Sequence, residues 1–312
     1  MSGPVRPEDA PPGPAPGPPP RSAPVVEVTE SRDAVVGTTR VRRALPRRGR
    51  RTVGAWCFAD HMGPVDVDPG RGVDIGPHPH TALHTVTWLL DGELLHRDSL
   101  GSEQVVRPGQ LNLMTAGRGV AHAEESTGRA RGTLEGVQLW VAQPSGTAAG
   151  GAAFEHHGEL PRADVGGGVA TVLVGELDGV RSPARADTPL AGVDLDLRGP
   201  ALLPLRPEWE YALVVLRGAA GVDGQVVEPG RLAYLGTGRD ELAVDAPEPA
   251  RALLLGGEPF AEPLVMWWNF VGRTRDDLAA AYESWRAGDD RFGRVASALP
   301  RIPAPEPYWP RR

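Results

Sequence analysis

The sequence has no lysine, and all 33 of its basic residues are arginine, which indicates a coding bias and lowers the weight of any single arginine. Its one cysteine, Cys57, excludes an intramolecular disulfide and fits a reducing compartment. No stretch approaches the roughly 18 consecutive apolar residues of a membrane span, and the N-terminus has no apolar signal core. We therefore expect a cytoplasmic protein with no membrane partner.

An excess of basic charge is also missing. The formal net charge is −7, which gives no general reason to expect a nucleic-acid partner, and no nucleic-acid motif is present. Residues 40–51 form a local basic run, which we interpret as a solvated loop rather than as a site for a polyanion.

Glycine and proline, in contrast, are abundant. There are 40 Gly and 33 Pro among 312 residues, a composition typical of a turn-rich β protein. Residues 1–24 are mostly proline, glycine and alanine, so we expect a disordered tail there. The remaining length is enough for two domains with cores of their own.

Short alternating segments separated by turn signals indicate an all-β fold of barrels or sandwiches. One segment, 85–90, ends at a hairpin signal, Asp91-Gly92. An internal repeat sets the domain count, because PGQLNLMTAG at 108–117 aligns without a gap with PGRLAYLGTG at 229–238. We therefore predict two tandem β-barrels over 25–145 and 152–271, joined by a linker near 143–151.

Residues after the second repeat are expected to add a strand, a short C-terminal helix and an extended tail, the last two over 272–312. The apolar run 263–271 is interpreted as one buried strand. Thr274 followed by Asp276 and Asp277 is a typical helix start. The helix then presents one apolar face, which consists of Leu278, Ala281, Tyr282 and Trp285.

Two histidine clusters in the first repeat indicate a metal site. The first is His78-Pro79-His80 with His84 behind it, and the second is His122-Ala123-Glu124. Residues i and i+2 of a strand share a face, so His78, His80 and His84 are expected on one face of their strand, and His122 and Glu124 on one face of theirs. If the two strands oppose each other across a barrel, these side chains converge on one point. Imidazoles with one carboxylate suit iron, copper, nickel, zinc or manganese and do not suit a calcium cage.

The second repeat differs at the corresponding positions. It has Glu208-Trp209-Glu210 and Arg239-Asp240-Glu241 there, with no histidine at these positions. We therefore expect the second barrel to lack transition-metal ligands and the first barrel to carry the chemistry.

The motifs PHPHTALHTVTWLLDGELLHRDSLGS, PGQLNLMTAGRGVAHAEES and GVQLWV resemble the pirin family of the cupin superfamily. The resemblance is dense from Arg42 to Val141 and looser through the second repeat, and it implies a bicupin. It also implies one metal, commonly iron, held by His78, His80, His122 and Glu124. A glutamate usually stands where this chain has His84, so His84 is a rival to Glu124 as the fourth ligand or a residue behind the ligands.

The family resemblance implies a metal-dependent dioxygenase that cleaves a flavonol such as quercetin, with a small aromatic substrate and O₂ as its partners. Glu124 would take up the substrate's proton. His61, with Asp60, is a candidate for the substrate entrance, and His96 is expected to have no part in the site. Candidates for the apolar wall of the pocket are Trp56, Phe58, Met114 and Trp140.

A second hypothesis is a non-enzymatic protein. The same four ligands would then hold a metal whose redox state regulates the binding of a protein partner. A different cupin reaction is a third possibility, because one fold hosts many chemistries. Ligand type and spacing do not separate these alternatives.

Overall fold

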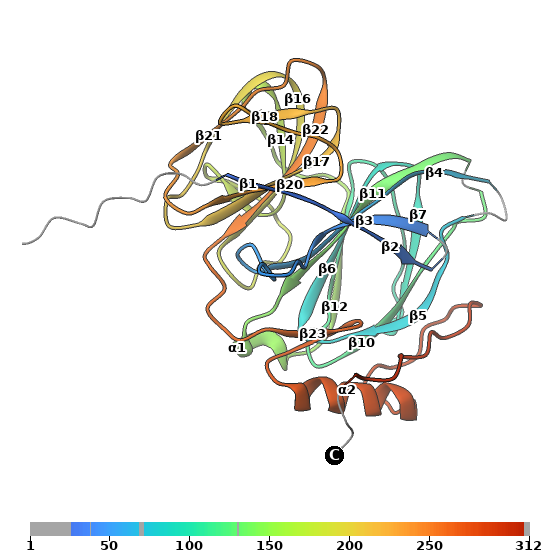
Figure 1. Ribbon diagram of the computed structural model, residues 1–312. Helices are drawn as coiled ribbons and strands as arrows, with labels where there is room; N and C mark the ends of the chain where they lie inside the picture. Colours follow the sequence, from blue (N-terminus) through green and yellow to red (C-terminus); the bar gives the residue numbers. More distant parts are fainter. Residues whose placement is uncertain (1–25, 38, 69–71, 130, 309–312) are drawn as a thin grey trace, which may run out of the picture.

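The computed structural model describes residues 26–37, 39–68, 72–129 and 131–308, and the tail expected over 1–24 lies outside them. Two β-barrels lie next to each other, and a C-terminal helix lies against the first (Figure 1). The fold class predicted from the sequence, all-β with two tandem barrels and a short C-terminal helix, is confirmed.

The first barrel consists of a seven-stranded and a four-stranded antiparallel sheet. The larger sheet has the order β12 (Ala153–His157), β9 (Leu111–Thr115), β6 (Leu83–Asp91), β11 (Gly132–Ala142), β4 (Trp56–Val67), β3 (Thr39–Leu45) and β2 (Arg32–Val36). The smaller sheet has the order β5 (Ile75–His80), β10 (Val120–Glu125), β7 (Leu94–Asp98) and β8 (Glu103–Val106).

The second barrel is built on a nine-stranded sheet. Its main path is β1 (Glu27–Glu30), β20 (Arg231–Gly236), β17 (Glu210–Arg217), β22 (Ala250–Gly257), β16 (Leu190–Pro204), β14 (Gly166–Leu177) and β13 (Arg162–Asp164). Beside this path, β15 (Val180–Arg181) pairs with β14, and β21 (Glu241–Val244) pairs with β16. A separate hairpin is formed by β18 (Ala220–Val222) and β19 (Gln225–Val227).

The sequence repeat is visible in the backbone. Gly109 precedes β9 with φ +84°, and its counterpart Gly230 precedes β20 with φ +85°. Both values lie in the left-handed region that glycine adopts at no steric cost. The Pro-Gly pair therefore makes the same turn in both barrels.

Two segments of the chain cross over between the barrels. β1 is N-terminal, yet it pairs with β20 of the second barrel. β12 follows the linker, whose short helix is α1 (Ser145–Ala148), and it returns to pair with β9 of the first barrel. Each barrel therefore includes a strand from the other barrel's side of the linker.

The C-terminal segment covers the four-stranded sheet of the first barrel (Figure 1). The prediction of a single strand over 263–271 is wrong, because the chain turns at Trp268, whose φ is +52°. Two short strands result, β23 (Val265–Trp267) and β24 (Phe270–Gly272), which form a hairpin.

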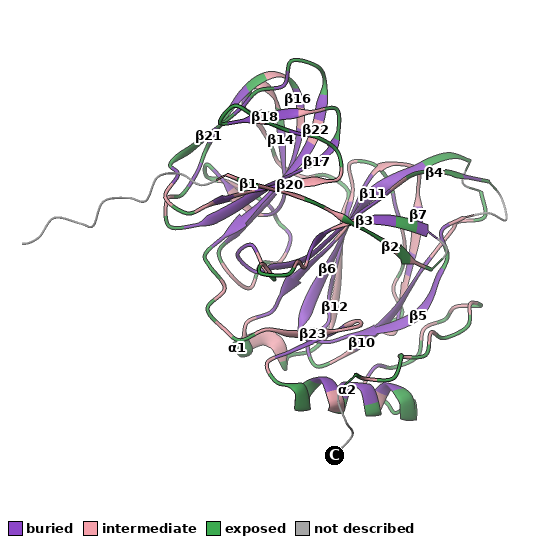
Figure 2. Ribbon diagram, viewed as in Figure 1, coloured by how far each residue is buried: buried purple, intermediate pink, exposed green. Residues whose placement is uncertain are grey.

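The predicted helix is confirmed as α2 (Arg275–Ala287), with Thr274 and Asp277 forming a capping box. Its buried face consists of Leu278, Ala281, Tyr282 and Trp285, and it packs against Ala121 of β10 (Figure 2). The helix thus lies directly behind a strand that carries a candidate ligand.

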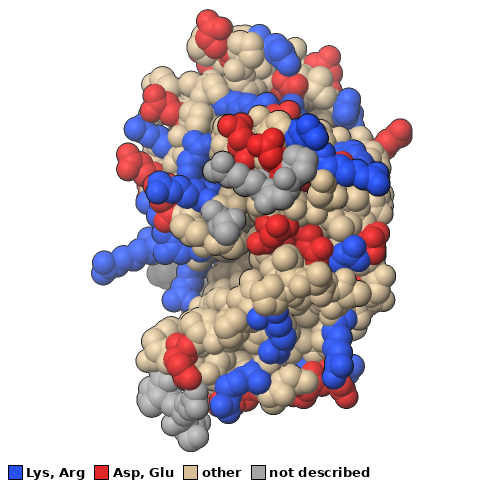
Figure 3. All heavy atoms as spheres, turned by 90° about the vertical axis from the view of Figure 1, so that its right-hand side faces the viewer, with Lys and Arg blue, Asp and Glu red and all other residues tan. Residues whose placement is uncertain are grey.

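A continuous apolar core joins the barrels. Trp56 is fully buried in it, and its indole nitrogen donates to the carbonyl oxygens of Ala191 and Gly256 in the second barrel, at 3.1 and 3.2 Å. On the face drawn in Figure 3, basic and acidic side chains are interspersed. Among the described residues, no helix has both the length and the apolar character needed to cross a membrane.

Candidate metal centre

Strands β5 and β10 bring the histidines of the two sequence clusters together. They pair antiparallel, with His78 opposite His122 and His80 opposite Val120. All six residues of β5 are buried, since the C-terminal segment lies against this strand. A strand that is covered on both sides can hold side chains in one fixed arrangement, as a metal centre requires.

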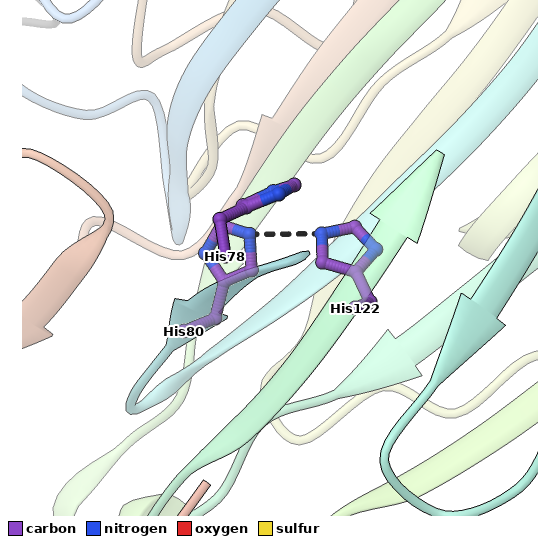
Figure 4. Close-up of side chains that lie close together, drawn as sticks. All are labelled: His78, His80 and His122. Carbon is purple, nitrogen blue, oxygen red and sulfur yellow. Dashed lines mark hydrogen bonds between the residues drawn. The ribbon is translucent and has the colours of Figure 1, made fainter. Parts of the chain in front are cut away.

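Candidate ligand atoms of His78, His80 and His122 all lie within 4.8 Å of one another (Figure 4). The Nε2 atoms of His80 and His122 are 3.0 Å apart. Two nitrogens that bind one ion at right angles, each at about 2.1 Å, would be separated by about 3 Å. The three histidines therefore fit a single transition-metal ion.

Hydrogen bonds orient two of these rings. Nδ1 of His78 donates to the carbonyl oxygen of Gly76 at 2.9 Å, and Nδ1 of His80 donates to that of Asn269 at 3.2 Å. A proton on Nδ1 leaves the Nε2 lone pair free for a metal, and such carbonyl partners are the usual support of metal-binding histidines.

Burial keeps the three imidazoles neutral. It lowers the pKa of His78 to about 4, and it lowers the pKa values of His80 and His122 well below the usual range. The neighbouring imidazoles lower these values further for His80 and His122. Because a metal binds neutral imidazole, the site is in its ligating form near neutral pH.

Glu124 lies beside the histidines but outside the group whose ligand atoms are within 4.8 Å. A register shift between His122 and Glu124 places Glu124 opposite Ile75. The carboxyl group is buried, receives a 3.4 Å contact from the Thr87 hydroxyl, and lines the same cavity as His78 and His80. Burial raises the pKa of Glu124 to about 7, so this carboxyl group can exchange a proton near neutral pH.

The expected common face of His84 with His78 and His80 is wrong. The strand breaks between them, because Ala82 has φ +53° and the chain passes from β5 in one sheet to β6 in the other. His84 instead lies with its Nδ1 2.9 Å from the Thr115 hydroxyl and its Nε2 3.1 Å from Asp187 of the second barrel. It joins the two barrels and lies away from the histidine group.

A cavity of about 300 Å³ opens at the histidines. Phe58 and Trp140 line it as a stacked pair, with ring centroids 4.0 Å apart, as the sequence predicted for these two residues. Arg43 lies 4.4 Å from the centre of the Phe58 ring and makes a bidentate ion pair with Asp60 at 2.7 and 2.6 Å. The cavity thus combines a flat aromatic wall with two polar ends.

Three other pocket predictions are wrong. His61 follows Asp60 on β4, so it points to the opposite face, where its Nε2 lies 2.9 Å from Glu135. Met114 is buried in an apolar cluster and does not line the cavity. Trp56 lies in the core between the barrels.

The structure adds residues that the sequence did not indicate. Trp268, Asn269 and Ile302 of the C-terminal segment line the cavity. His96 also lies at the site, with its ring 5.3 Å from that of His122 and its Nε2 3.0 Å from Asp98. The available signal for His96 was its spacing from Asp98, because residues i and i+2 of a strand share a face.

At the corresponding positions of the second barrel, other side chains take over the space. Trp209 is part of the apolar core of that barrel. Glu210 turns to the interface, where its carboxylate accepts hydrogen bonds from the Gly54 amide and the Tyr234 hydroxyl, both at 2.7 Å. Among the described residues, the histidine group of the first barrel is the only cluster of three potential ligands.

Two tandem barrels with one histidine-lined centre define a bicupin. The pirin family model matches residues 38–141, and the model of the pirin C-terminal cupin domain matches residues 192–293. This chain belongs to the pirin family.

Similar proteins agree with this assignment. The Pseudomonas aeruginosa protein named "Putative quercetin 2,3-dioxygenase PA1205" is 47% identical over 285 residues, which cover 90% of each chain. A pirin-like protein of Caulobacter vibrioides is 36% identical over 84% of this chain and 93% of its own.

Among solved structures, a quercetin 2,3-dioxygenase from Acinetobacter baumannii matches with a TM-score of 0.87 and 43% identity, over 92% of this chain and 97% of that one. The bacterial pirin YhhW from Escherichia coli, solved in complex with nickel(II), shares the fold with a TM-score of 0.60 and 16% identity, over 75% of this chain and 100% of that one.

Proposed function

We propose that this protein is a metal-dependent dioxygenase that acts on flavonols such as quercetin. The observation that carries the proposal is the group of three buried, neutral histidines that opens into a cavity with a flat aromatic wall. The names of the Pseudomonas and Acinetobacter relatives, at 47% and 43% identity, support the same reaction class.

His78, His80 and His122 would hold the metal. We propose Glu124 as the fourth ligand, since its carboxylate lines the cavity with His78 and His80 and it lies two residues from His122 on β10. Iron is the ion we expect first, and copper, nickel, manganese and zinc suit the same donor set. When bound, such an ion would supply a position for a substrate oxygen, and a redox-active ion, unlike zinc, would also supply a route for electrons to O₂.

Glu124 would also manage the substrate's proton. As an anionic group that lines the cavity, the Glu124 carboxylate is placed to accept a proton from a flavonol hydroxyl group. Thr87, whose hydroxyl contacts both Glu124 and Gln138, would keep the carboxyl group directed into the cavity. Deprotonation makes the flavonol ring electron-rich and therefore reactive toward O₂.

The walls of the cavity would orient the substrate. A flat ring system can contact the stacked pair of Phe58 and Trp140, which lines the cavity. Arg43 and Asp60 form a polar end suited to ring hydroxyl groups of a polyphenol. The combination suits a flat molecule with polar groups on an apolar frame.

The test is reconstitution of the full-length protein with Fe(II), Cu(II), Ni(II), Mn(II) or Zn(II), followed by measurement of quercetin loss and O₂ uptake. Turnover with at least one metal that stops on chelation supports the proposal. A protein that binds metal tightly yet turns over no flavonol would contradict it and would favour the regulatory alternative. A cytoplasmic location stays a prediction, which cell fractionation can test.

A further inference from the structure

The turn Trp268–Asn269 reaches the metal cavity from the tip of the C-terminal hairpin. Both residues line the cavity together with His78 and His80. The hairpin is anchored to the end of β5, where Thr81 bridges to Phe270 and its hydroxyl donates to the Val271 carbonyl at 2.9 Å. Because the anchor adjoins His80, the turn is held in register with the ligand strand.

The backbone at Trp268 is strained. Its φ of +52° lies in the left-handed region, where a bulky side chain is a true outlier and where glycine fits without penalty. Strain of this kind is concentrated at sites that contact ligands. Glycine at position 268 would allow the hairpin to turn without strain, so the turn itself does not require an indole at this position.

The neighbouring tryptophan provides a contrast. Trp267 packs edge-on against Tyr282 of α2, with ring centroids 5.7 Å apart, and it does not line the cavity. Trp268 is only half-buried, and its ring lies edge-on to Phe270 at 5.4 Å. Both tryptophans pack against the apolar cluster of the C-terminal segment, but only Trp268 also gives part of its surface to the cavity.

We propose that Trp268 is a substrate-contacting wall of the metal cavity, on which a flat aromatic substrate packs, and that it contributes to the choice of substrate. This inference rests on the proposed function, since it assigns Trp268 a role in holding the flavonol. The strain arises because the turn holds this position at a positive φ, which favours glycine, and the residue there carries an indole.

Four variants of the full-length, metal-loaded protein test this inference. Trp268→Gly removes the indole and suits the turn, Trp268→Ala removes it and keeps the strain, Trp268→Phe keeps an aromatic ring, and Trp267→Ala is the matched control. KM and kcat for quercetin, metal content and the thermal midpoint are measured for each. Binding of quercetin without O₂ is measured by titration calorimetry.

We expect Trp268→Gly and Trp268→Ala to raise KM and the anaerobic Kd about 10-fold, because an aromatic contact is lost. Their metal content should be unchanged, and the glycine variant should be at least as heat-stable as the alanine variant. Trp268→Phe should recover most of the affinity. Trp267→Ala should lower the thermal midpoint and leave KM unchanged.

Three outcomes would overturn the inference. One is an active wild type whose KM and Kd do not change in either Trp268 variant. Another is loss of metal from both variants, which would mean that the turn acts on His80 rather than on substrate. The third is a wild type that neither binds nor consumes quercetin, which would contradict both the proposed function and this inference. Binding of quercetin without turnover would contradict the proposed function alone, and the Kd values of the variants would still test Trp268.

Discussion

The two barrels share one scaffold but fill it differently. In the second barrel, Trp209, Leu213 and Leu254 belong to a continuous apolar core. In the first, the corresponding interior holds His78, His80 and a buried carboxyl group beside a cavity. One barrel is packed as a core, and the other is left open for chemistry.

An open, polar interior costs stability, because buried polar groups and unfilled space are both unfavourable. Packing against segments outside the first barrel offsets this loss of stability. The C-terminal segment packs on the back of its ligand strands, and the second barrel contributes to the shared core around Trp56. The second barrel and the C-terminal segment therefore support a centre whose three histidines all lie in the first barrel.

Loss of one histidine ligand should have the largest effect. His122→Ala should reduce bound metal to a small fraction and lower the turnover of quercetin by more than the 10–100-fold that a residue behind the ligands typically contributes. The β circular dichroism signal should be retained, because the core is built from other residues. Collapse of that signal would show that the metal is required for folding.

A core variant in the second barrel should act in the opposite way. Leu213→Ala removes a fully buried side chain and should lower the free energy of unfolding by about 2–5 kcal/mol. Metal content per folded chain should stay the same, as measured by elemental analysis of the protein purified at low temperature. A parallel loss of metal would contradict the division of roles between the barrels.

Variants of Glu124 and His84 distinguish a proposed metal ligand from a residue that links the two barrels. Glu124→Gln replaces an anionic oxygen by a neutral amide, so metal affinity should fall by at least 10-fold and the Co(II) spectrum should change. His84→Gln should leave both nearly intact and lower stability by about 1 kcal/mol, because the contacts to Thr115 and Asp187 are weakened. A large spectral change for His84→Gln with none for Glu124→Gln would reverse these roles.

The sequence was sufficient to bring His78 and His80 together, but not Glu124, which shares β10 with His122 and yet lies outside the histidine group. His78 and His80 share β5, so their alternation placed them correctly. It failed for His84, because a single residue, Ala82, adopts a positive φ that local composition did not reveal. The choice between Asp60 and His61 also failed, since alternation shows that the two point to opposite faces but not which face is the interior.

Contacts over long sequence distances could not be predicted. Asn269 is 189 residues from His80, and no pattern near either residue records their hydrogen bond. The repeat, in contrast, predicted the two barrels well, because a Pro-Gly turn is a local signal with one backbone solution. Local signals thus give the scaffold and the ligand pairs, and tertiary packing decides what covers them.

The last prediction is a pH-dependent effect of the charged link between the barrels. Glu135 of the first barrel is 2.9 Å from His61 and 2.8 Å from Arg217 of the second. Burial alone would raise the pKa of Glu135, but the hydrogen bonds from His61 and Arg217 outweigh burial and hold the pKa at about 2. The folded state therefore favours the ionised form over the range between that value and the unfolded pKa of about 4.3.

The sign of the pH effect follows from this lowered pKa. Stability from Glu135 is fully present above the unfolded pKa and is lost as the pH falls toward 2. Glu135→Gln should be less stable than wild type by about 1–2 kcal/mol at pH 7, and urea unfolding should show that the gap closes between pH 4.5 and 2. Asp91→Asn is the control, because Asp91 is the exposed partner of the same Arg217 and an exposed ion pair contributes about 0–1 kcal/mol. A gap that stays constant down to pH 2 would show that the ionised Glu135 does not stabilise the contact between the barrels.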